Sequence, residues 1–358
     1  MSIKYFVPLS GTVIRRYQKQ HDLPPHDVMD RSLLHGQIQL TLTAKTPIMV
    51  SNGKQIHEGR SWISCFATDA NGKYYVPGSS LRGLIRQNMQ ILGCGTVCVG
   101  RNEDIPEKYR SKRDNKFINT VSGNRDPKDG LPPSHKHPVL DYPRSIMGFV
   151  MQETQPASYN TQKRKTVCYR SRVSVGDLAA VGNPQAQPTV LIQPQLPRQS
   201  DPSFVTELGG GRFRLNGIRQ YPPRPIGPEP YRSYQGFRPL PAGTKFTGTI
   251  RYRNLHPDEL GLLLWCLRLE EGCLHTMGMG KANGYGQVTL EIDRLREFDP
   301  SQLYSSLTAS GTICANLDDR VTDLIGIYQD YAAKNISSGK NPAQMDHIRT
   351  FLELRRKR

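Results

Sequence analysis

Two segments in which a strand leads directly into a helix constrain the fold more than any other feature of the chain. In "YYVPGSSLRGLIRQNMQ" (74–90), an apolar strand runs into Pro77-Gly78, and apolar residues then recur at helical spacing until Gly93. In "GTKFTGTIRYRNLHPDELGLLLWCL" (243–267), an amphipathic strand precedes a helix with Pro257 in its first turn. The sequence therefore predicts two strand–helix units in one chain.

Further strands complete this pattern. Residues 36–50 alternate apolar and polar side chains, residues 167–178 return to strand alternation, and the glycine-rich loop 276–292 leads into a last strand. Helical segments are expected near 317–334 and 342–354. The order predicts an α+β fold with an antiparallel sheet, helices on one face, and a ferredoxin-like or RRM-like core.

The chain carries a large positive charge. It has 48 Lys and Arg against 31 Asp and Glu, a formal net charge of +17. Such a field attracts polyanions, nucleic acid above all, although a merely soluble basic protein is the alternative. No apolar stretch is long enough to span a membrane, no signal peptide is evident, and seven scattered cysteines fit a reducing compartment, so we expect a cytoplasmic protein.

The start of the first predicted helix is a candidate phosphate site. A helix N-terminus presents unpaired N–H groups and a partial positive charge. Serine hydroxyls and arginines add to these donors here, and the lysine of a nucleotide-binding loop is absent. A capped core helix with solvated arginines is the alternative. Either Ser79 or Ser80 is expected to be the N-cap of this helix. The candidate phosphate-binding residues are Gly78, Ser79, Ser80, Arg82 and Arg86.

A second candidate site is the loop "GMGKANGYGQV" (278–288). Its glycines permit positive φ and let the backbone approach a ligand closely. The loop follows a helix and precedes a strand, which is the reverse of a dinucleotide-binding fingerprint. We expect it to hold a phosphate backbone, with a tight turn as the alternative. The residues expected to contact phosphate are Gly280, Lys281, Asn283 and Gly284.

These two segments resemble one known family. "VPGSSLRGLIR" is similar to the N-terminal "PGSSLKG" signature of the RAMP superfamily, and "MGMGKANGYGQV" is similar to the C-terminal glycine-rich loop of that superfamily. Two looser matches, "DYPRSIMGF … YRSRVSVGDL" and the opening "YFVPLSG" with a later "TPIMV", agree. The resemblance covers most of residues 37–292 and is closest to the backbone-type RAMP subunits of type III CRISPR effector complexes.

The residue pattern divides the chain into a polar N-terminal arm with little expected structure at 1–35, a core at 36–292 with insertions at about 94–140 and 183–242, and a helical extension at 293–358. The resemblance implies that this core is RRM-like. Family backbone subunits stack along a guide RNA, hold its sugar-phosphate chain and kink it with a protruding hairpin. The implied partners are guide RNA, target RNA and other RAMP and effector subunits, in antiviral target-RNA recognition. The candidate for the hairpin is the basic loop 152–166, with Lys163, Arg164 and Lys165.

Cutting members of the family carry an aspartate in the loop after the first strand, where it acts with a divalent metal. The corresponding loop 51–61 has no aspartate, and its only imidazole and carboxylate are His57 and Glu58. His57 could serve as a general base, and Glu58 could bind Mg²⁺. We expect a solvated loop instead, so a metal-dependent endoribonuclease of target RNA or guide precursor is the alternative function. A general RNA-binding module outside CRISPR is another.

Two further features have two interpretations each. Two cysteines and two histidines bracket the first insertion, and could hold structural zinc; otherwise the cysteines are ordinary thiols. The four residues are Cys94, Cys98, His135 and His137.

The stretch 212–238 interleaves arginine with tyrosine and phenylalanine, which suits stacking on unpaired bases. The alternative is a proline-rich strap that packs inward or contacts another subunit.

Overall fold

The structure is a computed structural model of the chain. It describes residues 6–96, 140–152, 166–191, 205–209, 212–215, 217–227, 235–303, 305, 311–336, 339 and 341–356. Most of the predicted insertion at 94–140 therefore lies outside the described residues, as do the hairpin candidates Lys163, Arg164 and Lys165.

The main sheet has the strand order of a ferredoxin-like fold. Its four central positions, in spatial order, are β17 (Gln287–Glu297), β2 (Leu34–Ala44), β15 (Lys245–Leu255) and the pair β8 (Val173–Val175) with β9 (Leu178–Ala180). All neighbours are antiparallel. Numbered along the chain, the strands stand in the order 4-1-3-2, with helix α1 (Gly78–Leu92) and the short α4 (Tyr142–Met147) between the first and second and α5 (Pro257–Arg268) between the third and fourth. The predicted α+β ferredoxin-like core is confirmed.

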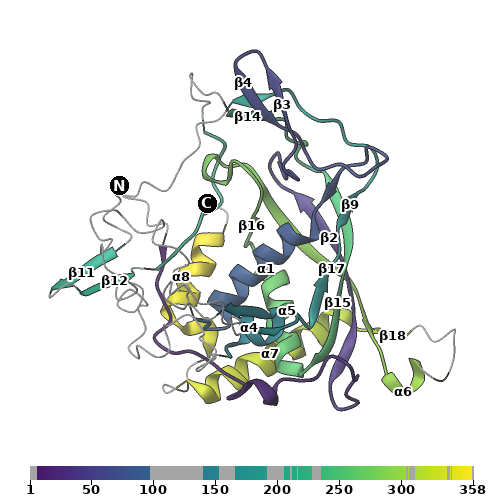
Figure 1. The fold of residues 1–358 in the computed structure, drawn as a ribbon, viewed down its shortest axis with the longest axis vertical. Coiled ribbons are helices and arrows are strands. Elements are labelled where there is room, and N and C mark those ends of the chain that lie inside the picture. The colour runs from purple at the N-terminus through teal and green to yellow at the C-terminus, as the bar shows by residue number, and fades with distance from the viewer. Residues whose placement is uncertain are drawn as a thin grey trace, which may run out of the picture.

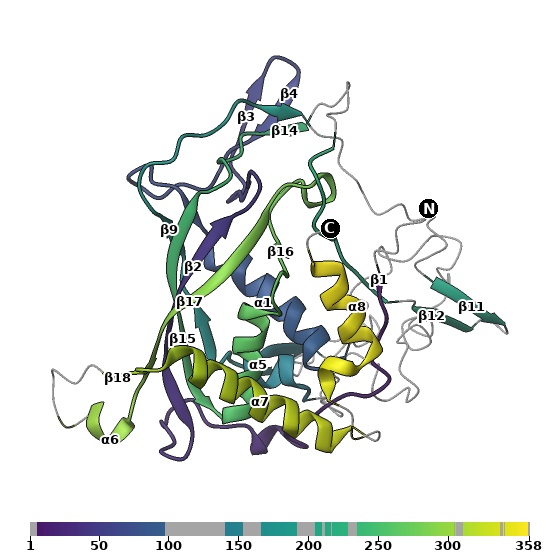
Figure 2. The same ribbon diagram turned by 180° about the vertical axis from the view of Figure 1, so that it is seen from behind.

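Helices cover one face of this sheet (Figure 2). The two core helices are α1 (Gly78–Leu92) and α5 (Pro257–Arg268), at the positions that the sequence predicts. Two C-terminal helices, α7 (Leu317–Asn335) and α8 (Asp346–Arg355), pack onto them. The helical extension thus belongs to the same hydrophobic core as the sheet.

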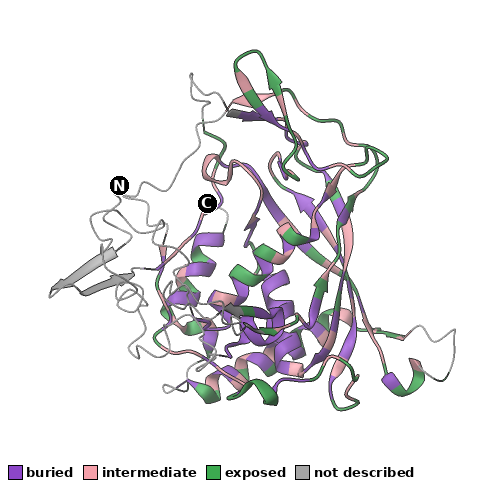
Figure 3. Ribbon diagram, in the orientation of Figure 1, coloured by how far each residue is buried: buried purple, intermediate pink, exposed green. Residues whose placement is uncertain are grey.

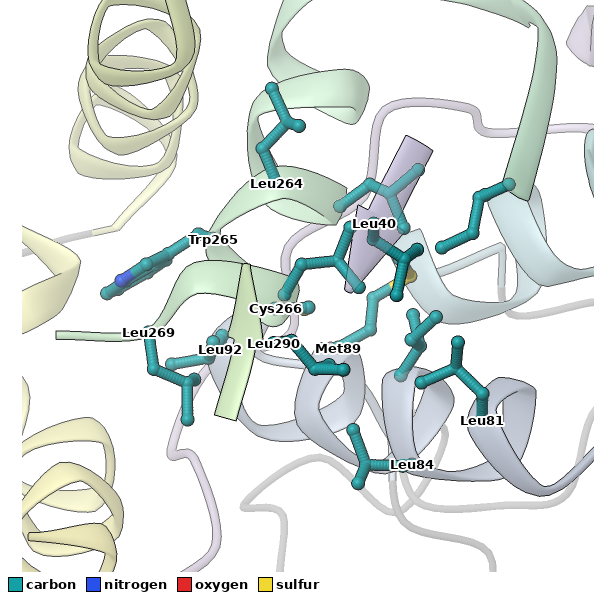
Figure 4. Close-up of a cluster of buried hydrophobic side chains, with 14 of the residues drawn as sticks. Leu40, Leu81, Leu84, Met89, Leu92, Leu264, Trp265, Cys266, Leu269 and Leu290 are labelled. Carbon is teal, nitrogen blue, oxygen red and sulfur yellow. The ribbon is translucent and has the colours of Figure 1, made fainter. Parts of the chain in front are cut away.

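Strand register explains why this face is apolar. Ile38 of β2 lies between Ile250 of β15 and Leu295 of β17, and all three are buried. Because side chains alternate along a strand, the neighbouring Gln37 falls on the opposite face, between Arg251 and Arg296. Figure 4 shows the apolar residues of β2, α1 and α5 in contact. The opposite face is polar and positively charged in this row.

A second, smaller sheet extends beyond one end of the main sheet (Figure 1). It contains β3 (Gln55–Glu58), β4 (Ser61–Ser64), β14 (Gln235–Phe237) and β10 (Val190–Leu191), with β14 parallel to β4. The prediction of a polar loop at 51–61 is wrong, because the segment turns back at Gly59, whose φ is 58°, and pairs with β4. Much of β3 and its turn is exposed (Figure 3).

The N-terminal segment is more ordered than the sequence predicts. β1 (Phe6–Val7) pairs with β13 (Ile218–Arg219), and Val7 and Ile14 are fully buried against the helices. Arg16 donates to the Asp258 carboxylate at the start of α5 at 2.7 Å. The expected arm with little structure is therefore a wrong prediction for residues 6–33: scattered apolar residues among polar ones cover the core.

The remaining elements are short. A hairpin of β6 (Phe149–Gln152) and β7 (Thr166–Tyr169) flanks the segment 153–165, as expected for a hairpin stem. The others are α4 (Tyr142–Met147), α6 (Pro300–Leu303), β5 (Tyr75–Val76), β11 (Val205–Gly209), β12 (Arg212–Leu215), β16 (His275–Thr276) and β18 (Thr312–Ile313), and the 3₁₀ turns Gln20–Asp22, Lys281–Asn283 and Pro342–Gln344.

Candidate nucleic-acid interface

The first turn of α1 already has an anionic partner. The backbone N–H of Gly78 donates to the carboxylate of Asp177 at 2.7 Å. Pro77 occupies the N-cap position, so the prediction of a serine N-cap is wrong, and Ser80 N–H bonds to the Pro77 carbonyl at 2.9 Å. Because a carboxylate satisfies the donor that the sequence offered to phosphate, this helix start is a structural junction with the β8–β9 turn.

The side chains predicted beside this helix start point to different partners. Ser79 is exposed and Ser80 half-buried. Arg82 donates to the Met147 carbonyl at 2.7 Å, which ties α1 to the C-terminus of α4. Arg86, one turn further along α1, is exposed. The structure therefore does not gather the serines and arginines into one cluster around a single point.

The glycine-rich loop has the backbone that the sequence predicts. It joins β16 to β17, and its four glycines all have positive φ, the values being 78°, 70°, 91° and 67°. These residues are Gly278, Gly280, Gly284 and Gly286. Between them, Lys281–Asn283 forms a single 3₁₀ turn. Other residues would be strained at these four positions.

Several of these glycines also permit close contact with the rest of the chain. A Cβ atom at Gly278 would lie 2.1 Å from the Met49 carbonyl oxygen, and one at Gly284 would lie 2.6 Å from the Pro225 carbonyl oxygen. The Asn283 carbonyl accepts from Gly227 N–H at 3.3 Å. The glycines thus allow the loop to pack closely against backbone atoms of Met49 and Pro225. This packing fixes the position of the loop.

Lys281 lies within this loop in a half-buried position. Its ammonium donates to the Gly278 carbonyl at 3.0 Å, and no carboxylate among the described residues pairs with it. Partial burial, with a contribution from the nearby Arg355 guanidinium, lowers the pKa of Lys281. A half-buried cation held by a carbonyl dipole favours an additional anionic partner.

Arg355, near the end of α8, is a second such cation, and the sequence analysis missed it. It donates to Thr276 Oγ1 at 2.6 Å and to Gln220 Oε1 at 2.5 Å, while 3% of its surface is accessible. Its Nε and the Gln220 Nε2 find no partner among the described residues. Burial lowers the pKa of Arg355 to about 10. Only the basic tail "RRKR", which begins at Arg355, hinted at this residue in the sequence.

Lys281 and Arg355 therefore bond to the same hairpin, which consists of β16, the glycine-rich loop and β17. Lys281 belongs to its loop, and Arg355 reaches it from α8. Lys281 bonds to Gly278 and Arg355 bonds to Thr276, two residues earlier in the hairpin. No carboxylate among the described residues forms an ion pair with either cation. Two cations without a counter-ion create a local positive potential that favours an anion.

The two residues considered for catalysis lie on the β3–β4 hairpin. Glu58 forms an ion pair with Arg238, and its other oxygen accepts from Thr189 Oγ1 at 3.4 Å. His57 is exposed and lies edge-on against Trp62, with ring centroids 4.9 Å apart. In the described parts of the chain, no three His, Cys, Asp or Glu residues come together as a metal site would require.

Of the predicted zinc ligands, the structure describes only Cys94. Its sulfur is buried, 3.6 Å from His347 Nε2 and 3.9 Å from Met345 Sδ at α8. Burial raises the pKa of this thiol to about 11, so without a metal ion the thiol is protonated. Cys98, His135 and His137 lie outside the described residues, so the zinc site stays a prediction.

The arginine- and tyrosine-rich stretch 212–238 is only partly described. Within it, Arg219 lies over the Tyr221 ring at 5.4 Å, and Phe237 is fully buried, with its ring 5.1 Å from that of Tyr285. Tyr231, Arg232 and Tyr234 lie outside the described residues. The described aromatics are thus engaged within the chain, as the inward-packing alternative expects.

Comparison with known proteins identifies the family. A sequence model of the RAMP superfamily matches residues 41–289, which run from the end of β2 to the start of β17 and include both core helices and the glycine-rich loop. The chain belongs to the RAMP superfamily. The RAMP resemblance of the two sequence motifs is thereby confirmed, and with it the place of the chain among CRISPR-associated proteins.

Other comparisons add little beyond membership in the RAMP superfamily. No curated protein matches the chain. Among solved structures, Csc2 from Thermofilum pendens aligns over 95% of this chain and 90% of its own, with 10% sequence identity and a TM-score of 0.38. None of the helices in the described ranges combines the length and apolar character that crossing a membrane requires.

Proposed function

We propose that this RAMP protein is an RNA-binding backbone subunit of a type III CRISPR effector complex, and that it holds the sugar-phosphate chain of a guide RNA beside a target RNA. RAMP membership and the net charge of +17 support an anionic nucleic-acid partner. The absence of a metal-binding cluster among the described residues gives no support to the nuclease alternative.

The observation that carries the proposal is the pair of cations at the glycine-rich hairpin. Lys281 lies within the loop of the hairpin that carries the family motif, Arg355 bonds to its first strand, and neither has a carboxylate partner among the described residues. A backbone phosphate at the loop surface supplies the missing negative charge and accepts a hydrogen bond from the half-buried Lys281, while the buried Arg355 adds to the positive potential there. Contacts of this kind recognise RNA without discriminating between bases.

A binding assay with varied salt tests the proposal. Labelled single-stranded RNAs of equal length and different sequence are titrated with the protein, and fluorescence anisotropy gives their affinities from 50 to 300 mM salt. We expect similar affinities for all sequences and a steep fall with salt. Lys281→Ala should weaken every RNA equally and flatten the salt slope by about 0.7, the value for one lost phosphate contact on a single strand.

A matched variant controls for net charge. Lys334 is exposed near the end of α7, and Lys334→Ala removes the same charge away from the hairpin. We expect this control to keep the wild-type salt slope. Equal effects of both variants, or a strong preference for one RNA sequence, would contradict backbone recognition at Lys281. Co-purification with a short RNA that has a fixed 5′ end would separate a CRISPR subunit from a general RNA-binding protein.

A further inference from the structure

Trp62 is the most conspicuous apolar side chain on the small sheet. It lies on β4, and 53% of its surface is accessible, whereas Trp265, the other tryptophan of the chain, is buried in the helical layer at 1%. Leaving a large indole in water is unfavourable, and exposed aromatics of this size commonly serve in binding. The rest of the RAMP core does not need Trp62 for packing.

A neighbouring histidine holds the indole in position without covering it. His57 is the direct cross-strand partner of Trp62, and the two rings meet at an angle of 71° with their centroids 4.9 Å apart. Perpendicular rings leave more of the indole accessible than a parallel stack would. Trp62 thus keeps an orientation before any ligand arrives.

The small sheet connects Trp62 to the glycine-rich hairpin. Ser64 lies beside Phe237 in the parallel pairing of β4 and β14, so their side chains share one face of the sheet. Trp62, two residues from Ser64, lies on that same face, about 7 Å along the strand. Phe237 packs on Tyr285, and a Cβ at Gly280 would touch both rings. One face therefore contacts the hairpin at one end and exposes Trp62 at the other.

The charge around Trp62 favours a polyanion. Arg60 is exposed in the turn two residues before Trp62, and Lys54 is exposed just before β3, while the single carboxylate of this strand, Glu58, is paired with Arg238. An exposed aromatic on a basic hairpin suits single-stranded nucleic acid, because the ring stacks on a base and the cations attract phosphates. An apolar protein surface would gain nothing from these cations.

We propose that Trp62 is a stacking site for one unpaired nucleobase of the RNA strand that passes the glycine-rich hairpin. The inference rests on the proposed RNA-binding function and assigns to β4 the contact with a base, while Lys281 contacts phosphate. Every base has a flat π surface, so stacking on Trp62 is consistent with binding that ignores sequence.

Tryptophan fluorescence tests the stacking site directly. Because Trp265 is buried, emission that changes on titration with single-stranded RNA reports Trp62. We expect an oligouridine to quench this emission with the same midpoint that anisotropy gives for binding. An oligonucleotide of the same length with abasic sites keeps the phosphates but removes the bases, and it should bind more weakly and leave the emission unchanged.

Substitutions provide a second readout. Trp62→Ala should weaken RNA binding about fivefold to a hundredfold, the range for loss of one base–aromatic stack. Trp62→Phe keeps a stacking ring and should retain most of the affinity while abolishing the quenching. The matched control is Val181→Ala, since Val181 is similarly exposed, at 52%, outside the small sheet. Thermal melting followed by circular dichroism checks that each variant is folded.

The outcomes separate the two proposals. RNA that binds by anisotropy without quenching Trp62, or abasic RNA that quenches it equally, overturns the stacking site and leaves the backbone function intact. Quenching caused by a protein subunit of the complex and by no RNA would also overturn it, and would assign Trp62 to a protein interface. Failure of every RNA to bind overturns both proposals.

Discussion

The backbone N–H of Gly78 and the carboxylate of Asp177 lie 2.7 Å apart, so the anion at the start of α1 comes from the chain itself. Glycine is required at position 78 because a Cβ atom there would lie 2.4 Å from the Val175 carbonyl oxygen. The "PGSS" signature therefore has a structural role in this protein. It permits close packing between α1 and the β8–β9 turn.

Substitution of Asp177 tests this role. Asp177→Ala leaves the Gly78 N–H without its partner and should lower the free energy of unfolding by about 1 kcal/mol, as loss of a helix cap does. Asp177→Asn keeps a carbonyl acceptor and should cost less. Urea unfolding measures both. Because both variants remove the same negative charge, any gain in RNA affinity should be the same in both. Equal stability of the wild type, Asp177→Ala and Asp177→Asn would contradict the capping role.

The ion pair between Arg172 and Glu259 provides a stability prediction. Both side chains are almost completely buried, and Arg172 Nη1 lies 2.6 Å from Glu259 Oε2. Arg172→Leu leaves an unpaired buried carboxylate and should cost about 3–5 kcal/mol. The double variant Arg172→Leu/Glu259→Leu should recover part of this loss. Chemical denaturation of the wild type, Arg172→Leu, Glu259→Leu and the double variant gives the coupling energy, and strictly additive effects would show that the pair does not interact.

Buried histidines predict that acid destabilises the protein. Burial lowers the pKa of His275 and of His347 to about 4, from the ordinary imidazole value of about 6.5. The unfolded chain therefore binds more protons between these values, so stability falls as pH falls through this window. Each histidine contributes about 1.4 kcal/mol per pH unit below pH 6.

Urea unfolding from pH 7.5 to 5.5 measures this loss. In this range, carboxylates remain ionised in both states and should not contribute. His275→Gln should lower stability at neutral pH, because His275 Nε2 bonds to the Leu267 carbonyl at 2.8 Å, but it should also reduce the pH dependence. A wild-type stability that is constant down to pH 5.5 would argue against neutral buried imidazoles.

Incubation with Mg²⁺ tests the nuclease alternative. Glu58 is paired with Arg238, so we expect the protein to leave guide and complementary RNA uncut, alone or in its complex. Denaturing gels with labelled RNA show any product. Regularly spaced cuts that disappear in Glu58→Ala or His57→Ala would instead establish a metal-dependent endoribonuclease. Glu270→Ala, at the end of α5, is a control for loss of a carboxylate elsewhere.

The strands and helices of the core could be predicted from sequence because their signals are local. Alternation in β2 and β15, Pro257 in the first turn of α5, and Gly93 after α1 each depend on neighbouring residues. The N-terminal segment could not be predicted, since Val7 and Ile14 are buried by helices that follow them by many residues.

The candidate site also combines local features, which the sequence predicts, with long-range contacts, which it does not. The positive φ values of Gly280 and Gly284 follow from residue type and were predictable. The bond between Gly78 and Asp177 spans 99 positions, and the bonds of Arg355 to Gln220 and Thr276 span 135 and 79. No local pattern indicates such partners. Lys281 was predictable because it lies within the glycine-rich motif, whereas the role of Arg355 is evident only after the chain has folded.

The position of Arg355 near the end of α8 has a consequence for biosynthesis. The ribosome makes the glycine-rich hairpin first, and the residue that bonds to Thr276 and Gln220 emerges from the exit tunnel much later. A nascent chain can form the sheet before that moment, but it cannot complete the charge cluster. Stalled or truncated products that lack α8 should therefore compete poorly for RNA with finished molecules.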